Sequence, residues 1–239
     1  AYDVTGDGTK DKIRIRAANQ TDDEAYSSLT VSVNGKTAYR LKNTRFYNVI
    51  ANIYTLKNGQ PFLYLYAPAE NGDGPVCALL KYTNGKFRKI LDFTEIMAGY
   101  GDHRIGEVTN LNGNKIVITE SIVSYSLGIN AINFTYEYVN GKFVPTSKYG
   151  SYKEIYSADG SSRYFTVNSN LPAYTRPGAT AVNTTLKTGS LTKIIKCALI
   201  SGKMYIQLEC DGEIYWIKAL ENPPISDNER QFMEVRYAG

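Results

Sequence analysis

The first residues of the chain carry acidic side chains at a spacing that suits a metal ion. Counted from Asp3, aspartates occupy positions 1, 5 and 9 of the segment, and a threonine occupies position 3. Carboxylate and hydroxyl oxygens are ligands that Ca²⁺ prefers, a backbone carbonyl at position 7 can add another, and Gly8 permits the sharp turn between them. The sequence therefore predicts one structural calcium ion, with the ligands Asp3, Thr5, Asp7, Thr9 and Asp11.

The spacing of this loop resembles the short calcium loops of the VCBS/FG-GAP class of propeller-type repeats, in which such a loop joins two strands of a blade. Thr5 stands where Asp or Asn is more usual in that class, and the loop differs from an EF-hand because Arg14 stands at position 12. A second interpretation stays open, in which the aspartates accept hydrogen bonds from the backbone N–H groups of a polar turn.

A catalytic histidine would have to be His103, because it is the only histidine of the chain. A cell-wall Cys–His peptidase needs a cysteine that opens a helix, whereas Cys77 lies in an apolar strand pattern. One histidine and three scattered cysteines cannot supply the ligands of a zinc site. We therefore expect His103 to contact Asp102 or its neighbours, and we expect Cys77, Cys197 and Cys210 to be small buried residues.

Paired carboxylates could hydrolyse a glycan, and the candidates for such a pair are Glu107, Glu120 and Glu137. At alternating strand positions, however, such residues more often belong to a solvated face. The chain contains no GxGxxG, GxSxG or phosphate-binding-loop motif. We therefore expect a protein without catalytic activity of its own, and a carboxylate-dependent hydrolase is the alternative.

The composition indicates a β-rich globular protein. The 239 residues include 20 Tyr and 20 Gly, and 43% are hydrophobic, which is enough for a packed core. The 27 Lys and Arg residues nearly balance the 23 Asp and Glu residues, so the net charge of +4 does not favour nucleic acid as a partner. No apolar run approaches the roughly 18 residues of a membrane span. The chain starts at Ala1 with no signal segment before it, which favours a mature or trimmed exported protein.

Three repeats punctuated by glycine turns occupy the first 150 residues. Asn-Gly-Lys occurs three times, and each copy follows an earlier glycine turn by 26 to 28 positions. The glycine pairs are Gly8 and Gly35, Gly59 and Gly85, and Gly113 and Gly141. Asn-Gly favours the two-residue type I′ hairpin turn. Each repeat is therefore predicted to contain two hairpins, or about four antiparallel strands, which is the size of one propeller blade.

The segments between these turns alternate apolar and polar residues with a period of two, as strands do. The clearest are residues 12–16, 29–33, 62–66, 115–119 and 132–136. We predict an all-β fold in which residues 1–155 form about three four-stranded antiparallel blade-like repeats. An incomplete, partial propeller-like domain, a stacked array of sheets and a sandwich all fit this pattern.

The repeat pattern ends near Gly150, and the turn-rich segment 157–162 is a predicted junction. The segments that follow resemble, in their order, the bacterial SH3-like (SH3b) family. The resemblance rests on an early loop with Pro177-Gly178, an aromatic middle hairpin, and the Asp211-Gly212 turn followed by Trp-Ile-Lys. Two residues depart from the family pattern, because Met204 stands where Trp is common and Tyr215 where Gly is common. The resemblance implies an SH3-like small barrel with a C-terminal tail over residues 156–239.

The resemblance also implies a shallow aromatic face for a ligand, made by Tyr174, Arg176, Tyr205, Tyr215 and Trp216. Ring faces supply contact area, and an arginine can pair with a carboxylate of a peptide or glycan. A second interpretation stays open here too, in which these rings only cover the core of a small barrel.

These observations favour a secreted or cell-surface bacterial protein that binds and does not catalyse. We expect its SH3-like domain to engage cell-wall peptide or glycan, or another surface protein. A glycan hydrolase in the repeat domain and a purely structural or assembly module are the alternatives.

Overall fold

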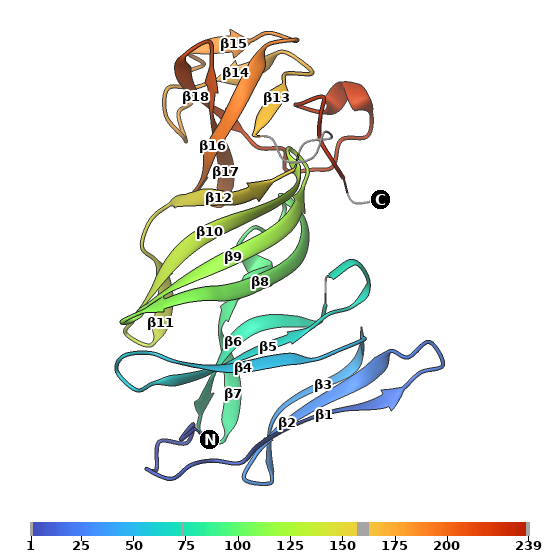
Figure 1. The fold of residues 1–239 in the computed structure, drawn as a ribbon, viewed down its shortest axis with the longest axis vertical. Coiled ribbons are helices and arrows are strands. Elements are labelled where there is room, and N and C mark those ends of the chain that lie inside the picture. Colours follow the sequence, from blue (N-terminus) through green and yellow to red (C-terminus); the bar gives the residue numbers. More distant parts are fainter. Residues whose placement is uncertain (1, 73, 157–162, 238–239) are drawn as a thin grey trace. The chain divides into compact units, whose positions relative to one another are not determined.

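The computed structural model describes residues 2–72, 74–156 and 163–237. Strands make up 61% of the chain, and no helix in the described residues reaches seven residues. Short 3₁₀ turns are η1 (Glu70–Gly72), η2 (Phe93–Glu95) and η3 (Asp227–Glu229). The protein is all-β and built from several antiparallel sheets, which confirms the predicted fold class (Figure 1).

The chain divides into two compact units, each of which is described by itself. The first unit comprises Ala1–Ile96, Asn110–Ile116 and Glu137–Val144. The second unit comprises Met97–Thr109, Val117–Tyr136 and Pro145–Gly239. The boundary predicted at residues 155 and 156 falls inside the second unit, where β12 (Tyr149–Ile155) pairs with β16 (Leu191–Ile200). Independent folding of residues 1–155 and 156–239 stays a prediction, and its junction, 157–162, lies outside the described residues.

Two antiparallel sheets form most of the first unit. One sheet has the order β1-β2-β3, with β1 (Ile13–Gln20), β2 (Tyr26–Val33) and β3 (Lys36–Phe46). The other has the order β4-β5-β6-β7, with β4 (Ile50–Thr55), β5 (Pro61–Ala67), β6 (Val76–Thr83) and β7 (Lys86–Asp92). Alternate residues of both sheets contribute to one shared hydrophobic core, which includes Leu29, Val31, Leu63, Leu65 and Leu80.

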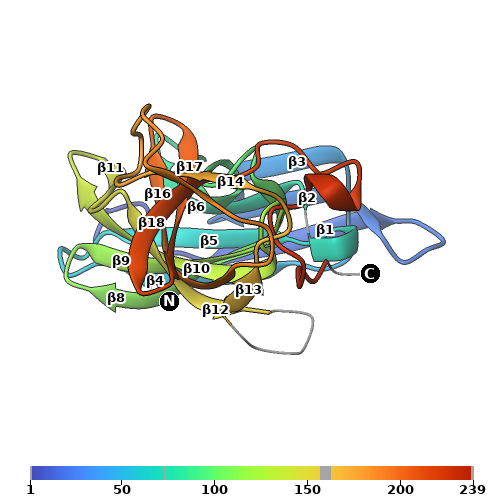
Figure 2. The ribbon, with the colours of Figure 1, turned by 90° about the horizontal axis from the view of Figure 1, so that it is seen from above.

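The second unit is built on a long antiparallel sheet with the order β18-β17-β16-β12-β10-β9-β8. Its remaining strands are β8 (Gly101–Asn112), β9 (Lys115–Ser124), β10 (Gly128–Val139), β17 (Lys203–Cys210) and β18 (Glu213–Lys218). β11 (Lys142–Pro145) pairs with β10, and β13 (Tyr164–Thr166) pairs with β16. β14 (Leu171–Ala173) and β15 (Thr184–Leu186) form a separate hairpin-like pair (Figure 1), and β14 is also labelled in the view from above (Figure 2).

The predicted hairpin turns are present with the expected backbone conformation. At each Asn-Gly-Lys site both turn residues have positive φ, for example 49° at Asn34 and 82° at Gly35. A type I′ turn requires positive φ at both central residues, which asparagine tolerates and glycine adopts without strain. The Asp211-Gly212 turn between β17 and β18 follows the same rule, with φ of 53° and 81°. Local turn chemistry therefore determines the hairpins of both units.

The repeats differ from one another in strand number. β4 to β7 form the predicted four-stranded sheet, whereas the first repeat has three strands. Its fourth segment, before Ile13, is a loop whose described residues form no strand and contain one isolated bridge, between Tyr2 and Asp11. β8 to β11 are four consecutive strands, but they continue into the long sheet of the second unit. The cysteines Cys77, Cys197 and Cys210 are buried, as predicted.

Candidate ligand-binding site

The N-terminal acidic loop is held together by its own aspartates. The carboxylate of Asp11 accepts the backbone N–H groups of Val4 at 2.7 Å and Thr5 at 2.9 Å, and the side-chain amide of Asn34 at 2.6 Å. The carboxylate of Asp3 accepts the backbone N–H groups of residues 6, 7 and 8 at 2.6, 3.2 and 2.8 Å. These are the hydrogen bonds of a polar turn.

Electrostatics at Asp11 agree with this arrangement. The Asp11 side chain is 6% exposed, and burial alone would raise its pKa. Hydrogen bonds from Thr5, Asn34 and Val4 outweigh burial, so the pKa of Asp11 lies below its ordinary value. In the described part of the chain, no group of three or more His, Cys, Asp or Glu side chains gathers closely enough to hold a metal ion. Calcium bound by Asp3, Thr5, Asp7, Thr9 and Asp11 stays a prediction.

Three of the five predicted ligand-binding residues come together in the second unit. Tyr205 and Trp216 form a buried cluster with Ala198, and Tyr174 packs against it. Tyr174 and Trp216 also exchange two backbone hydrogen bonds, of 2.8 and 2.9 Å. Because Trp216 is 4% and Tyr205 is 8% exposed, these rings mainly form the interior of the cluster.

The other two predicted residues lie apart from this cluster. Tyr215 is half-buried and precedes Trp216 on β18, so its side chain points to the opposite face of the strand. Arg176 is exposed in the loop that follows β14. The sequence order therefore places Tyr174, Tyr205 and Trp216 correctly beside one another, while strand alternation separates Tyr215 from them.

The exposed aromatic residue of this region is Tyr149, which sequence reasoning missed. Its ring centroid lies 5.9 Å from that of Trp216, and the ammonium group of Lys196 lies 4.6 Å from the Tyr149 ring and 6.0 Å from the Trp216 ring. The Lys148 ammonium lies 5.3 Å from the Tyr149 ring. Tyr149 is 38% exposed, so part of its ring can meet a ligand while Trp216 and Lys196 hold it in place.

A hollow of about 370 Å³ with a mixed polar and apolar lining lies beside this pair. It is bordered by the ring of Tyr149 and the side chain of Lys196. Val117 and Gly150 form part of the wall, and the remaining lining residues carry hydroxyl or amide groups, namely Asn133, Thr135, Thr146, Ser147 and Ser151. Thr119 donates a 2.7 Å hydrogen bond to the side-chain oxygen of Asn133, which fixes the orientation of that amide. The hollow therefore offers donors, acceptors, one cation and one ring edge within the second unit.

The carboxylates considered for catalysis lie in different environments. Glu120 is fully buried, and its Oε2 atom lies 3.3 Å from Nε2 of His103. Burial raises the pKa of Tyr136 to about 12, and the nearby Glu120 carboxylate acts in the same direction. Glu107 is exposed. His103 and Glu120 thus form a pair in the interior of the second unit.

The comparisons add no relative to this description. Searches against protein-family models, curated proteins and solved structures found no match to the chain. The SH3b and VCBS/FG-GAP resemblances therefore stay interpretations of the residues quoted for them. None of the helical turns in the described residues has the length and apolar character needed to cross a membrane.

Proposed function

We propose that this protein is a non-catalytic binding protein of the bacterial cell surface, and that its second unit binds a carboxylate-bearing cell-wall glycan or its peptide stem. The observation that carries the proposal is the exposed ring of Tyr149 beside Lys196 at the border of the 370 Å³ hollow, whose lining is part polar and part apolar. The SH3b-like order of residues 162–220 supports the cell wall as the source of the ligand.

The chemistry of the hollow suits a sugar chain. Sugar rings present C–H faces that pack on aromatic rings, and hydroxyl groups that both donate and accept hydrogen bonds. Tyr149 supplies the ring, and Asn133, Thr135 and Ser151 supply groups that both donate and accept. The Lys196 ammonium can pair with a carboxylate of the ligand, since it lies at the border of the hollow.

The ligand contacts differ from those expected from the sequence. Because Tyr205 and Trp216 are buried, we assign them to holding Tyr149 and Lys196 in place. A ring held in one orientation loses little conformational entropy when a ligand packs on it, which favours binding. Arg176 is exposed and keeps its proposed role as a second cation for a longer ligand.

Sedimentation with purified peptidoglycan tests the proposal. Tyr149→Ala and Lys196→Gln should each weaken binding by about tenfold or more, since truncation of a central aromatic or cationic contact commonly costs more than about 1 kcal/mol. The matched control is Tyr164→Ala, because Tyr164 is also an exposed tyrosine, 50% exposed, with a lysine, Lys193, 5.8 Å from its ring. Tyr164→Ala should bind like the wild type.

Peptidoglycan whose carboxylates have been converted to amides separates the two contributions. It should bind the wild type more weakly than unmodified peptidoglycan does, and the loss should be smaller for Lys196→Gln, in which only Arg176 is left of the two proposed cations. Wild-type protein that never sediments would refute the cell-wall ligand, and equal losses in Tyr149→Ala and Tyr164→Ala would refute the site.

A further inference from the structure

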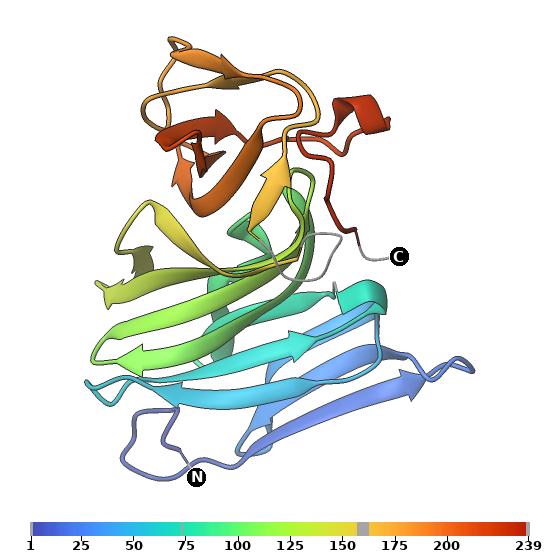
Figure 3. The same cartoon turned by 45° about the horizontal axis from the view of Figure 1, so that its top comes forward.

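The first unit contains a groove between two strands that do not pair with each other. Half-buried apolar side chains of β1 and β4 line its middle, namely Ile13, Ile15, Ala51 and Ile53. The other lining residues are Tyr2, Lys10, Asp11, Lys12, Asn52 and Leu63. The volume of this part is about 690 Å³. A second hollow of about 400 Å³ shares Ile15 and Ala51 with it and extends to Val49 and Tyr47. Figure 3 shows β1 and β4 side by side in the lower part of the molecule.

Both strands that border the groove are the last strands of their sheets in the described structure. On the β1 side, Lys12 bonds to Asn34 of the neighbouring hairpin through both its N–H and its C=O group. In an antiparallel pair these groups point alternately toward and away from the partner strand, so those of Ile13, Ile15 and Ala17 point away from β2. A row of backbone donors and acceptors therefore faces the groove.

The same reasoning applies to β4. The N–H group of Leu56 bonds to the carbonyl of Gln60, on the side where β4 pairs with β5. Alternation then directs the N–H and C=O groups of Ala51 and Ile53 away from β5. On the opposite side of the two sheets, the Lys86 ammonium donates a 3.0 Å hydrogen bond to the Thr37 carbonyl between the ends of β7 and β3, and the hollow between these strands is smaller, about 250 Å³. The groove between β1 and β4 is therefore the wider of the two openings of this two-sheet core.

The charges along β1 indicate which kind of strand can pair with its free edge. Lys12, Arg14 and Arg16 are exposed and alternate with Ile13 and Ile15, so they lie on the outer face of the sheet. Opposite charges on adjacent strands stabilise a sheet, and like charges directly opposite each other destabilise it. The basic edge therefore disfavours pairing with β1 of a second copy and favours a strand with acidic residues on its outer face.

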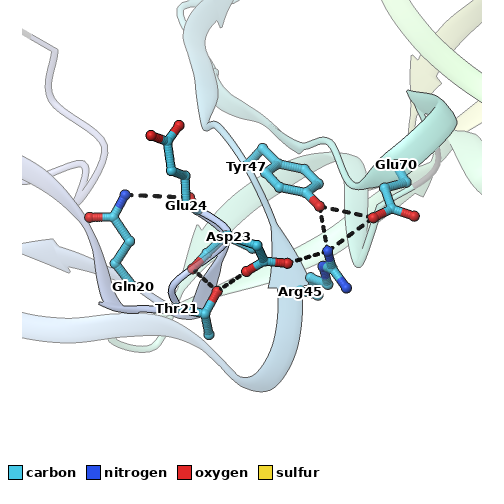
Figure 4. Close-up of polar contacts among 8 residues, drawn as sticks. Gln20, Thr21, Asp23, Glu24, Arg45, Tyr47 and Glu70 are labelled. Atoms are coloured by element: carbon cyan, nitrogen blue, oxygen red, sulfur yellow. Dashed lines mark hydrogen bonds and ion pairs between the residues drawn. The ribbon is translucent and has the colours of Figure 1, made fainter.

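A polar network fixes one end of the groove (Figure 4). Arg45 binds Asp23 and lies 2.9 Å from the Glu70 carboxylate, while the Tyr47 hydroxyl donates to the same Glu70 oxygen at 2.9 Å. The backbone N–H of Tyr47 also bonds to the Pro68 carbonyl at 2.8 Å. These contacts hold the connection from β3 to β4 against the segment after β5, so the end of the groove at Tyr47 is formed before any partner arrives.

We infer that the groove between β1 and β4 binds an extended segment of another protein, in which apolar and acidic residues alternate. The segment adds a strand to the free edge of β1. Its apolar side chains fill the groove beside Ile13, Ile15 and Ile53, and its acidic side chains pair with Lys12, Arg14 and Arg16. None of these residues belongs to the proposed cell-wall site, so either proposal can fail without the other.

The probe is a seven-residue peptide of alternating valine and glutamate, acetylated and amidated at its ends, titrated into the full chain. Binding is followed by fluorescence anisotropy, and amide hydrogen exchange locates the site. We expect saturable binding and at least tenfold slower exchange of the Ile13, Ile15 and Ala17 amides. A peptide of the same composition without the alternation, and one with lysine in place of glutamate, should bind at least tenfold more weakly.

Charge reversal provides the matched pair of variants. Arg14→Glu with Arg16→Glu should weaken binding of the valine–glutamate peptide at least tenfold. The same double variant should bind the lysine peptide more tightly than the wild type does. Arg40→Glu with Lys42→Glu makes the same change of net charge at exposed positions of β3 and should leave binding within twofold. Protection confined to other strands, equal loss in both double variants, or self-association of the free chain through β1 would each overturn the proposal.

Discussion

The carboxylate of Asp11 joins the two ends of the N-terminal loop, because its Oδ2 atom accepts the backbone N–H of Val4 at 2.7 Å. The same oxygen accepts the N–H of Thr5, and the second oxygen accepts the amide of Asn34 at the tip of the β2–β3 hairpin. One buried side chain thus connects the loop to the first sheet of the first unit. Hydrogen bonds to the carboxylates of Asp3 and Asp11 therefore hold the backbone of the loop in this conformation.

We predict that Asp11→Asn lowers the free energy of unfolding at pH 7 by about 1–3 kcal/mol, because a buried N–H group loses its acceptor. The pKa of Asp11 is lower in the folded chain than its ordinary value of 3.8, so its contribution is complete at pH 7 and is lost as the pH falls below about 4. Urea unfolding of wild type and variant from pH 7 to pH 3 should show their difference shrinking. Asp7→Asn, at an exposed position, is the control and should cost less than about 0.5 kcal/mol. A difference that stays constant with pH would contradict the role of the charge.

Calcium binding to this loop has its own test. If Asp3, Thr5, Asp7, Thr9 and Asp11 hold Ca²⁺, millimolar Ca²⁺ should raise the melting temperature and EDTA should lower it, because a ligand bound only to the folded state stabilises that state. Asp7→Asn should abolish this difference. Identical melting curves with Ca²⁺ and with EDTA would leave the loop as the hydrogen-bonded polar turn alone.

The features that sequence reasoning predicted are those that neighbouring residues determine. The Asn34-Gly35 turn requires positive φ at two adjacent positions, so the dipeptide itself specifies the hairpin. The contact of Tyr149 with Trp216 instead needs β12 to pair with β16, in addition to the hairpin pairing of β16 with β17 and of β17 with β18. No turn in the sequence marks β12 and β16 as neighbours. The position of Lys196 beside Tyr149 depends on the same pairing of β12 with β16. The aromatic cluster was therefore predicted in part, and its exposed member was missed.

We predict that the three cysteines do not react with thiol reagents in the folded chain. Burial raises the pKa of Cys197 to about 12, so almost none of it is the reactive thiolate at pH 8, and burial also raises the pKa of Cys210. Labelling with Ellman's reagent should be slow in buffer and complete in denaturant. Ser226→Cys, at an exposed position, should add one thiol that reacts at once. Rapid native labelling of wild type would mean that the sheet of the second unit opens locally at one of these strands.

Gly150 follows Tyr149 on β12 and faces the core of the second unit. We predict that Gly150→Ala destabilises the fold. A Cβ atom at this position would lie 2.5 Å from Cε1 of Phe134 and 2.9 Å from Sγ of Cys197, both of which are buried side chains. Neither can move without disturbing packed neighbours, and overpacking of this kind costs about 1–3 kcal/mol. Ser151→Ala, on the exposed face of the same strand, should change stability by less than about 0.5 kcal/mol. Thermal and urea unfolding of the two variants measure the difference.

The result also bears on the ligand site, because unchanged stability in Gly150→Ala would mean that β12 can move away from β10 and β16. Tyr149 would then not be held rigidly, and its ring would offer a ligand less than the proposed function requires.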